Sequence, residues 1–408
     1  MRLFWATTVW FPGTIFGCNQ LAGIGEPVDR PDAMHSADAP HSSDGAPEAD
    51  RDVSVPPDDV SVPPDDVSAS PDDVDAGNAC TPSAPRAARV TGVRALGSQT
   101  QPPTVTQRNL TTSARLGQDV LWAFGGIFLG VVPPDGNTFQ SSNAAKSTLL
   151  DPVHLSESLD DMSLPTPLIP LTQEEIDFNK RDGGDSKVVL LPSSVVPMGN
   201  GDTAIIFFGK YIARGDLNWT GVSTGIARLP AGATTAARDA SSLFSDPEPL
   251  YSHAAVSFEG DLYLYACNTG GFCSVARAPV ARVSEHDAWR AFSDSESGPT
   301  WSADFGAATG VLDNVGGTVS VSYNAHLGSF VAVYGEPLGP RILLRTAPRP
   351  EGPWSAPVLV YDAASSGIFG AIEHPAFSKK CGQTLLVSYS HLVRDFAGTV
   401  ELVEVTLD

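Results

Sequence analysis

One pattern recurs along the chain and constrains its fold more than any other feature. Residues 225–230, 274–279 and 343–348 each end a strand-like run with an Arg two or three positions before a Pro. After the last two copies, a Trp stands near the start of a new strand-like run, at Trp289 and Trp354. The copies lie about 50 to 70 residues apart, a spacing that suits a four-stranded sheet with its loops. The pattern therefore predicts a repeated β-sheet unit.

The chain after Cys80 is built from short runs rich in Val, Ile, Phe and Tyr, separated by turns with Gly and Pro. Such runs are typical of β-strands. At about 60 residues per unit, roughly 300 residues give five units. We predict an all-β fold, a five-bladed β-propeller over residues 81–408, with a pair of β-sandwiches as the alternative. The best strand candidates are residues 120–124, 203–208, 262–266, 318–323, 330–334, 342–345 and 385–389, and residues 173–179 could form one or two helical turns.

The N-terminus has the features of an export signal. Arg2 precedes an apolar run at residues 3–16, and residues 15–18 (Ile-Phe-Gly-Cys) approximate the lipobox at which bacteria cleave a leader and lipidate the new N-terminal Cys. The run is shorter than the roughly 20 residues of a membrane-spanning helix. We predict a lipoprotein signal peptide over residues 1–17, lipidation of Cys18, and an extracytoplasmic location at the outer membrane or cell surface. A cleaved secretory signal and a chance apolar N-terminus are the alternatives.

Residues 18–80 are expected to form a disordered acidic linker. The motif Val-Ser-Val-Pro-Pro-Asp-Asp occurs twice in tandem from Val53, and a variant follows it. Pro excludes a helix, and repelling Asp pairs extend the chain. Between Cys18 and Cys80, 15 acidic residues and two Arg supply −13 of the total net charge of −22. The Asp pairs are an unsuitable calcium site, because no turn makes six or more oxygens converge.

The charge also bears on partners. The globular part remains acidic and has no basic stripe, so the electrostatic attraction that drives binding to phosphates is missing and nucleic acid is excluded. We find no Cys-x-x-Cys pair and no His cluster at metal spacing, so we expect neither zinc nor another cofactor. We expect a monomer that meets the membrane only through its lipid anchor.

Four Cys remain after Cys18, and they allow three disulfide pairings. Cys267 and Cys273 flank a Gly-rich turn between two strand-like runs, which favours a bridge between them. Cys80 and Cys381 would then pair. This bridge would join the start of the domain to its last strands and close the ring.

Three segments resemble a known family. They are residues 301–305 (Trp-Ser-Ala-Asp-Phe), 317–324 (Gly-Thr-Val-Ser-Val-Ser-Tyr-Asn) and 345–354, which end in Gly-Pro-Trp. They are similar to a family of bacterial exported proteins with an uncharacterised domain, related to five-bladed-propeller glycoside hydrolases. Some of its members are endo-D-arabinanases that act on cell-wall arabinan. The resemblance runs from about residue 110 to residue 406 and implies a propeller that acts on polysaccharide.

The chain departs from this family at one motif. The family's first inner strand typically reads Trp-x-Phe-Gly-Asp-Thr, whereas residues 122–127 read Trp-Ala-Phe-Gly-Gly-Ile. Gly126 stands at the carboxylate position and Ile127 at the Thr position. Glycoside cleavage normally needs two carboxylates, so this departure favours binding without cleavage.

Other residues could supply a site. Glu373 and Asp304 are the candidate catalytic carboxylates; Glu373 precedes the segment expected to form the last inner strand, and Asp304 lies in a family-like segment. The alternatives are a solvated rim Glu and a turn-forming Asp. Asp313 and Glu336 are weaker candidates. The candidate substrate-binding residues are Asn324, His374, Tyr323 and Trp122, for which a turn cap, a structural His and core aromatic residues are the alternatives.

Three functions follow from these observations. The first is a surface-anchored glycoside hydrolase that acts on an arabinan-like cell-wall glycan. The second is a glycan-binding module that kept the pocket and lost its acid. The third is a structural lipoprotein of the envelope, since a propeller by itself implies no chemistry.

Overall fold

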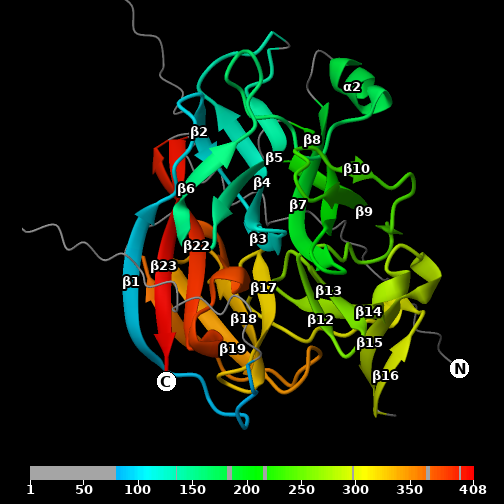
Figure 1. Cartoon of the computed structure of the whole chain (residues 1–408). Coiled ribbons are helices and arrows are strands. Elements are labelled where there is room, and N and C mark those ends of the chain that lie inside the picture. Colours follow the sequence, from blue (N-terminus) through cyan, green and yellow to red (C-terminus); the bar gives the residue numbers. More distant parts are fainter. Residues whose placement is uncertain are drawn as a thin grey trace, which may run out of the picture. The chain divides into compact units, whose positions relative to one another are not determined.

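The strands form five antiparallel sheets. The computed structural model describes residues 80–134, 136–181, 186–214, 218–295, 298–363, 368–394 and 397–408. The predicted signal peptide, the lipidation site at Cys18 and the linker up to residue 79 lie outside these described residues. Figure 1 shows the sheets arranged around a centre.

Each sheet is one blade. Blade 1 contains β2 (Val105–Arg108), β3 (Thr111–Leu116), β4 (Asp119–Leu129), β5 (Phe139–Thr148) and β6 (Asp151–Glu157). Blade 2 contains β7 (Ser186–Met198), β8 (Thr203–Arg214), β9 (Asn218–Pro230), β10 (Ala237–Arg238) and β11 (Phe244–Ser245). Blade 3 contains β12 (Ala254–Phe258), β13 (Asp261–Cys267), β14 (Cys273–Pro279), β15 (Arg290–Ser295) and β16 (Gly298–Ser302).

The last two blades have four strands each. Blade 4 contains β17 (Val319–Asn324), β18 (Ser329–Gly335), β19 (Arg341–Ala347) and β20 (Val358–Asp362). Blade 5 contains β21 (Ile368–Glu373), β22 (Thr384–Arg394), β23 (Ala397–Leu407) and, from the start of the domain, β1 (Val90–Ser98).

The innermost strands of the blades close a ring. β3 contacts β7, β7 contacts β12, β12 contacts β17, β17 contacts β21, and β21 contacts β3. The prediction of a five-bladed propeller is therefore confirmed, and the alternative of two sandwiches is wrong.

Helices are short in this fold. The predicted helical turns form α2 (Gln173–Lys180), which begins at Thr172 with a capping box. The described 3₁₀ turns are η4 (Val280–Arg282), η5 (His286–Ala288), η6 (Phe305–Ala307), η7 (Pro375–Phe377) and η8 (Lys380–Gly382). Within the described part of the chain, no helix has the length and apolar character needed to cross a membrane.

The recurring sequence pattern marks equivalent places in the fold. Its three copies end β9, β14 and β19, which are the third strands of blades 2, 3 and 4. The two following Trp residues lead into β15 and β20, the fourth strands of their blades. Trp289 is fully buried and its indole N–H donates to the carbonyl oxygen of Val283 at 3.0 Å.

The two ends of the domain meet in blade 5. β1 pairs antiparallel with β23, from Val90 opposite Leu407 to Ser98 opposite Glu401. Cys80 forms a disulfide with Cys381, with 5.5 Å between their Cα atoms, and the predicted bridge between Cys267 and Cys273 is present as well. Both predicted pairings are confirmed. Disulfides persist in oxidising compartments, which indicates an extracytoplasmic location for the domain.

The core is divided among the seams between blades. The seam of blades 2 and 3 holds Phe207 and Trp289, and that of blades 5 and 1 holds Trp122 and Leu402. Separate apolar clusters fill the remaining seams. Because these seams are dry and packed, the strand ends around the axis are left for a site.

Candidate functional site

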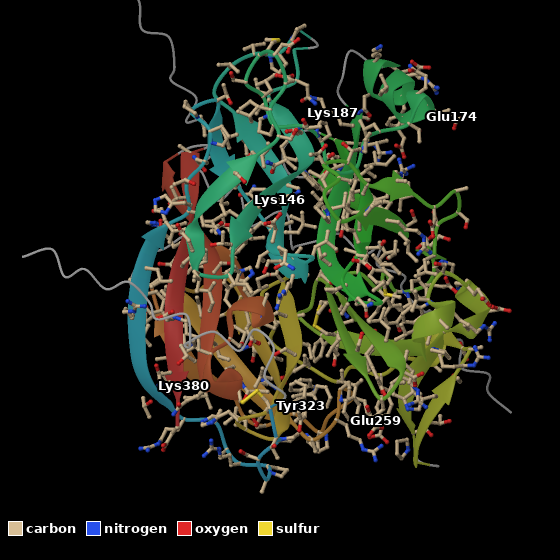
Figure 2. All side chains as sticks on the ribbon, in the orientation of Figure 1. Lys146, Glu174, Lys187, Glu259, Tyr323 and Lys380 are labelled. Atoms are coloured by element: carbon tan, nitrogen blue, oxygen red, sulfur yellow. A yellow bond between two sulfur atoms is a disulfide. The ribbon has the colours of Figure 1, made fainter. Side chains whose placement is uncertain are left out.

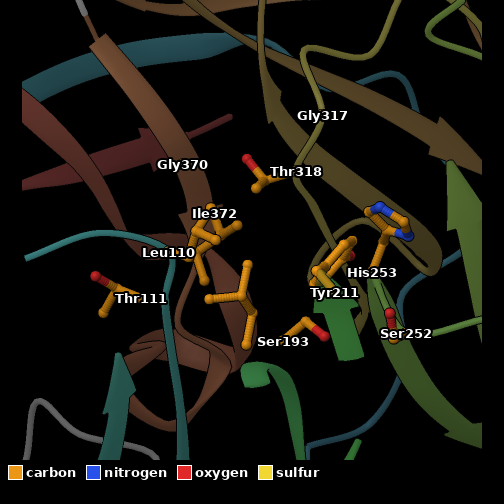
Figure 3. A pocket seen from close by; sticks show the side chains of 11 residues that line it. Leu110, Thr111, Ser193, Tyr211, Ser252, His253, Gly317, Thr318, Gly370 and Ile372 are labelled. Atoms are coloured by element: carbon orange, nitrogen blue, oxygen red, sulfur yellow. The ribbon is translucent and has the colours of Figure 1, made fainter. Parts of the chain in front are cut away.

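A cavity of about 60 Å³ lies on the propeller axis, near the start of the inner strands. All five blades contribute to it, and Figure 3 shows the side chains gathered around the opening. The lining residues are Leu110, Thr111, Leu191, Ser193, Tyr211, Ser252, His253, Gly317, Thr318, Gly370 and Ile372.

Hydroxyl groups supply much of the polar surface of this axial cavity. The side-chain oxygens of Thr111 and Thr318 are buried and have no hydrogen-bond partner. Ser390 of β22, whose hydroxyl oxygen lies 3.7 Å from where a Cβ on Gly370 would be, is unpartnered in the same way. Buried polar groups are normally satisfied. These three hydroxyls can therefore donate to or accept from a bound molecule.

His253 is the titratable His of the cavity. Burial lowers its pKa to about 4, against a hydrogen bond with the backbone of Leu250 that raises it. Its Nδ1 accepts the backbone N–H of Cys267 at 3.2 Å, so the remaining proton sits on Nε2. At neutral pH the imidazole is uncharged and brings no positive charge to the cavity.

Tyr211 lies across the cavity from β8, and a nearby glycine makes room for it. A Cβ on Gly209 would stand 2.6 Å from the Tyr211 ring. The ring is 7% exposed and lies 6.3 Å from that of Trp219. Any side chain larger than hydrogen at residue 209 would displace the tyrosine.

A second, larger cavity of about 480 Å³ adjoins the axial one, because both are lined by Tyr211, His253 and Gly317. It extends over blade 3. Its other lining residues are Pro247, Pro249, Leu250, Ala266, Cys267, Asn268, Thr269, Phe272, Ser274, Phe305, Gly306, Ala308 and Gly310.

Neither cavity is lined by a described carboxylate. Within the described ranges, no group of three or more His, Cys, Asp or Glu side chains is placed to hold a metal ion. Hydroxyls, amides, an uncharged imidazole and aromatic rings can hydrogen-bond and stack on an uncharged polar molecule. The usual two-carboxylate arrangement for glycoside cleavage is not found among these lining residues.

Glu373 ends β21, the inner strand of blade 5, rather than preceding it as expected. It is 3% exposed, and its Oε2 accepts the hydroxyl of Ser322 at 2.7 Å. Burial raises the pKa of Glu373 to about 7, against the Ser322 hydrogen bond, which lowers it. Its neighbour Ile372 lines the axial cavity. Since successive strand side chains point to opposite faces, Glu373 points away from the cavity towards β17.

His374 and Trp122 are packed together in the interior. Both are fully buried, with ring centroids 4.5 Å apart. His374 bonds the hydroxyl of Ser113 through Nδ1 and that of Ser388 through Nε2, each at 2.7 Å, and burial lowers its pKa to about 3. The Trp122 N–H donates to Ser147 at 2.8 Å. The structure brings these two candidates together, in the core.

Asn324 and Tyr323 end β17, at the opposite end from Thr318. Asn324 is 3% exposed; its amide donates to the carbonyl of Gly382 at 2.8 Å and accepts the N–H of Leu327 at 2.9 Å. Tyr323 is 39% exposed, stacks on Phe258, and lies at an edge of the molecule in Figure 2. The structure places neither beside the axial cavity.

The other candidate carboxylates hold turns or ion pairs. Asp304 is exposed and caps η6, where its side chain accepts the N–H of Gly306 at 3.0 Å. Asp313 pairs with Arg345 at 2.6 Å. Glu336 pairs with Arg341, which lowers the pKa of Glu336. None of these three carboxylates lines either cavity.

Gly126, at the family's carboxylate position, lies in β4, which is the second strand of blade 1 and not its inner strand. Its φ is +84°, a conformation that glycine tolerates best. A Cβ there would stand 3.2 Å from the Phe139 ring and 3.8 Å from the side-chain nitrogen of Asn109. The local backbone is therefore built around a glycine.

The axial hydroxyls were missed by sequence reasoning. Thr111, Ser193, Ser252 and Thr318 are small polar residues at or near inner strands, a place where turn residues are common. The sequence offers one signal, the run Gly316-Gly317-Thr318 ahead of β17. Their convergence depends on ring closure, which no local pattern reveals.

Comparison with solved structures supports the fold. A provisionally named hydrolase from Bacteroides ovatus has a TM-score of 0.53 and 14% identity, over 75% of this chain and 87% of that one. An exo-β-1,3-galactanase from Phanerochaete chrysosporium has a TM-score of 0.49 and 12% identity, over 78% and 65%. The catalytic domain of a GH62 α-L-arabinofuranosidase from Coprinopsis cinerea has a TM-score of 0.45 and 7% identity, over 78% and 98%. At these identities the likeness concerns the fold alone.

No curated protein sequence matches this chain. A family model does, over residues 112–393, which is more than half of the chain. The match covers the segments in which the family resemblance was seen. The chain therefore belongs to the family described as a domain of unknown function, DUF4185.

Proposed function

We propose that this protein binds a polysaccharide at the axial mouth of its propeller and does not cleave it. The observation that carries the proposal is the lining of the two adjoining cavities, which among described residues offers hydroxyls, amides and aromatic rings but no carboxylate. Cleavage by the usual route needs two carboxylates, whereas binding needs none.

The choice of polysaccharide rests on resemblance. Family members that act on arabinan make an arabinan-like cell-wall glycan the first ligand to test, and the fold shared with the Bacteroides ovatus hydrolase supports a carbohydrate site at the mouth. Sites on one fold can differ in chemistry. Xylan and β-1,3-galactan therefore belong in the same panel.

The test compares binding with product release. The full-length protein is titrated with each glycan by calorimetry, and parallel mixtures are assayed for new reducing ends. We expect saturable binding of at least one glycan and no release of reducing ends. Release that exceeds a heat-inactivated control would reject binding without cleavage, and no binding to any glycan would reject the proposal as a whole.

Hydrolysis is the second candidate, and the raised pKa of Glu373 favours it. A carboxyl group with a pKa of about 7 is suited to act as a general acid near neutral pH. In this hypothesis Glu373 is the acid and Asp304 the second carboxylate. If reducing ends are released, Glu373→Gln should lower the rate by about 100-fold or more, and an unchanged rate would remove Glu373 from the reaction.

The envelope location is proposed on the leader and the disulfides. Lipid attached at Cys18 would anchor a monomeric domain outside the cytoplasm, where Cys80–Cys381 and Cys267–Cys273 can form. Growth with a labelled fatty acid should mark the wild-type protein and leave Cys18→Ser unmarked. Equal labelling of both would contradict the anchor.

A further inference from the structure

Phe272 is an exposed aromatic ring on the lining of the larger cavity. It is 53% exposed, and it makes no ring contact with a described residue. Exposed Tyr323, by contrast, stacks on Phe258 and meets Phe330 edge-on. Large rings usually bury most of their surface. An aromatic ring left open inside a cavity is therefore a surface on which a ligand can pack.

The loop that carries Phe272 is closed and rigid. The disulfide between Cys267 and Cys273 joins its two ends, which face each other as paired residues of β13 and β14. Asn268 bonds the loop from inside: its Oδ1 accepts the backbone N–H groups of Gly270 at 2.9 Å and Phe272 at 3.1 Å. A ring held by such a loop loses little conformational freedom when a ligand binds.

The loop is also fixed to the next blade. Its residue Gly271 accepts the N–H of Val315 at 3.1 Å, and the backbone of Cys273 exchanges hydrogen bonds with Val311 and Leu312. Gly271 has a φ of +77°, and a Cβ there would stand 3.2 Å from the backbone of Val315. Phe272 therefore has a set position relative to blades 3 and 4.

The remaining lining decides the chemistry of the ligand. Asn268, Thr269 and Ser274 are polar and uncharged, and the shared His253 is neutral near pH 7 because burial lowers its pKa to about 4. No described Lys, Arg, Asp or Glu lines the cavity. A carboxylated sugar would leave its charge without a counter-charge in a strongly acidic protein.

We propose that Phe272, positioned by the Cys267–Cys273 disulfide, is the stacking platform of a subsite for an uncharged sugar ring in the cavity over blade 3. The apolar C–H face of the sugar packs on the phenyl ring, while its hydroxyls meet Asn268, Thr269 and Ser274. The proposal rests on the proposed function and adds to it a residue and a ligand class: neutral glycans, as opposed to polyuronates.

The test uses calorimetry of the full-length protein with arabinan, xylan and β-1,3-galactan as neutral probes and polygalacturonate as the charged probe. Phe272→Ala should weaken neutral-glycan binding by about tenfold or more. Phe272→Tyr keeps a ring and should retain most of the affinity. Leu338→Ala, which changes an 83% exposed apolar residue outside both cavities, is the matched control and should bind as the wild type does.

A second pair of variants separates positioning from stability. Cys267→Ser/Cys273→Ser should weaken binding while circular dichroism shows a folded domain, and Cys80→Ser/Cys381→Ser should lower the melting temperature and leave the affinity unchanged below it. Wild-type affinity in Phe272→Ala overturns the subsite but leaves the proposed function standing. Equal or tighter binding of polygalacturonate overturns the neutral ligand class, and a wild type that binds no glycan overturns both proposals.

Discussion

Glu373 lies buried between two inner strands, and its carboxyl is held by a single neutral donor, Ser322. Burial raises its pKa to about 7 from 4.5. The folded protein therefore keeps a proton that the unfolded chain releases between these two values. Stability should fall as the pH rises from about 4.5 to about 7, by roughly 3 kcal/mol in total.

The variant Glu373→Gln removes this titration. We expect its free energy of unfolding to exceed that of the wild type at pH 8 and to depend less on pH between 4.5 and 7, as measured by urea unfolding. Asp304→Asn, which alters an exposed turn-capping carboxylate, is the control. Parallel pH profiles for the wild type and Glu373→Gln would contradict the burial argument.

Asn324 is a residue whose importance is structural. Asn324→Ala should cost about 1 to 3 kcal/mol, because it leaves the N–H of Leu327 and the carbonyl of Gly382 without partners in the interior. Asp313→Ala breaks an exposed ion pair and should cost less than about 1 kcal/mol. Equal losses in urea unfolding would show that the amide is dispensable.

At the residue scale, the sequence predicted chemistry better than position. Glu373, His374 and Trp122 were singled out by residue type, and they do lie on or beside inner strands, yet they face the interior between blades. Whether a strand residue faces a seam or the axis changes with every step along the strand. A bulge between Phe369 and Ile372 shifts that alternation in β21, and no sequence signal marked it.

Among the elements, α2 shows how one buried carboxylate fastens a helix to a blade. Glu175 completes the capping box with Thr172 and pairs at 2.6 Å with both Arg238 and Lys210. Burial alone would raise the pKa of Glu175, but the bonds from Arg238, Lys210 and Thr172 lower it to about 2. Its ionised form therefore stabilises the folded state above the ordinary carboxyl pKa.

Glu175→Gln should destabilise the domain at pH 7 by on the order of 3 kcal/mol, and the difference from the wild type should vanish as the pH falls from about 4.5 towards 2. Glu174→Gln changes the exposed neighbour in the same turn, labelled in Figure 2, and is the matched control. A loss that persists undiminished in urea unfolding at pH 2.5 would rule out the ion pairs as its source.

Strands with a complete apolar run were predictable, as β8, β13 and β18 show. The two-residue strands β10 and β11 were not, since each forms only by pairing with β9. α2 was predictable because its start carries its own capping signal, Thr172 followed three residues later by Glu175. Local signals thus located elements that can be recognised without their neighbours.

For the whole molecule, the two disulfides should differ in their effect on stability. The bridge from Cys80 to Cys381 spans 301 residues and that from Cys267 to Cys273 spans six. Loop-closure entropy gives about 5 to 6 kcal/mol for the long loop and about 2 kcal/mol for the short one. Cys80→Ser/Cys381→Ser should therefore lower the melting temperature more than Cys267→Ser/Cys273→Ser. The reverse order in thermal unfolding would refute the entropic ranking.

The number of blades was predictable from repeat spacing, and the closing bridge from cysteine arithmetic. The place of β1 was not, because its partner β23 lies at the far end of the chain and pairing over such a distance leaves no local trace. The axial cavity shares this origin: its hydroxyls converge from all five blades once the ring is complete.

The pairing of β1 with β23 sets an order of events for a protein that leaves its cytoplasm N-terminus first. β1 emerges some 300 residues ahead of the strand it must join, a delay of roughly 15 to 60 s at the pace of ribosomal synthesis. Through that interval blade 5 lacks its outer strand, and its backbone groups are open to any passing β-edge. Such a chain would gain from a periplasmic chaperone that shields β1 until β23 emerges.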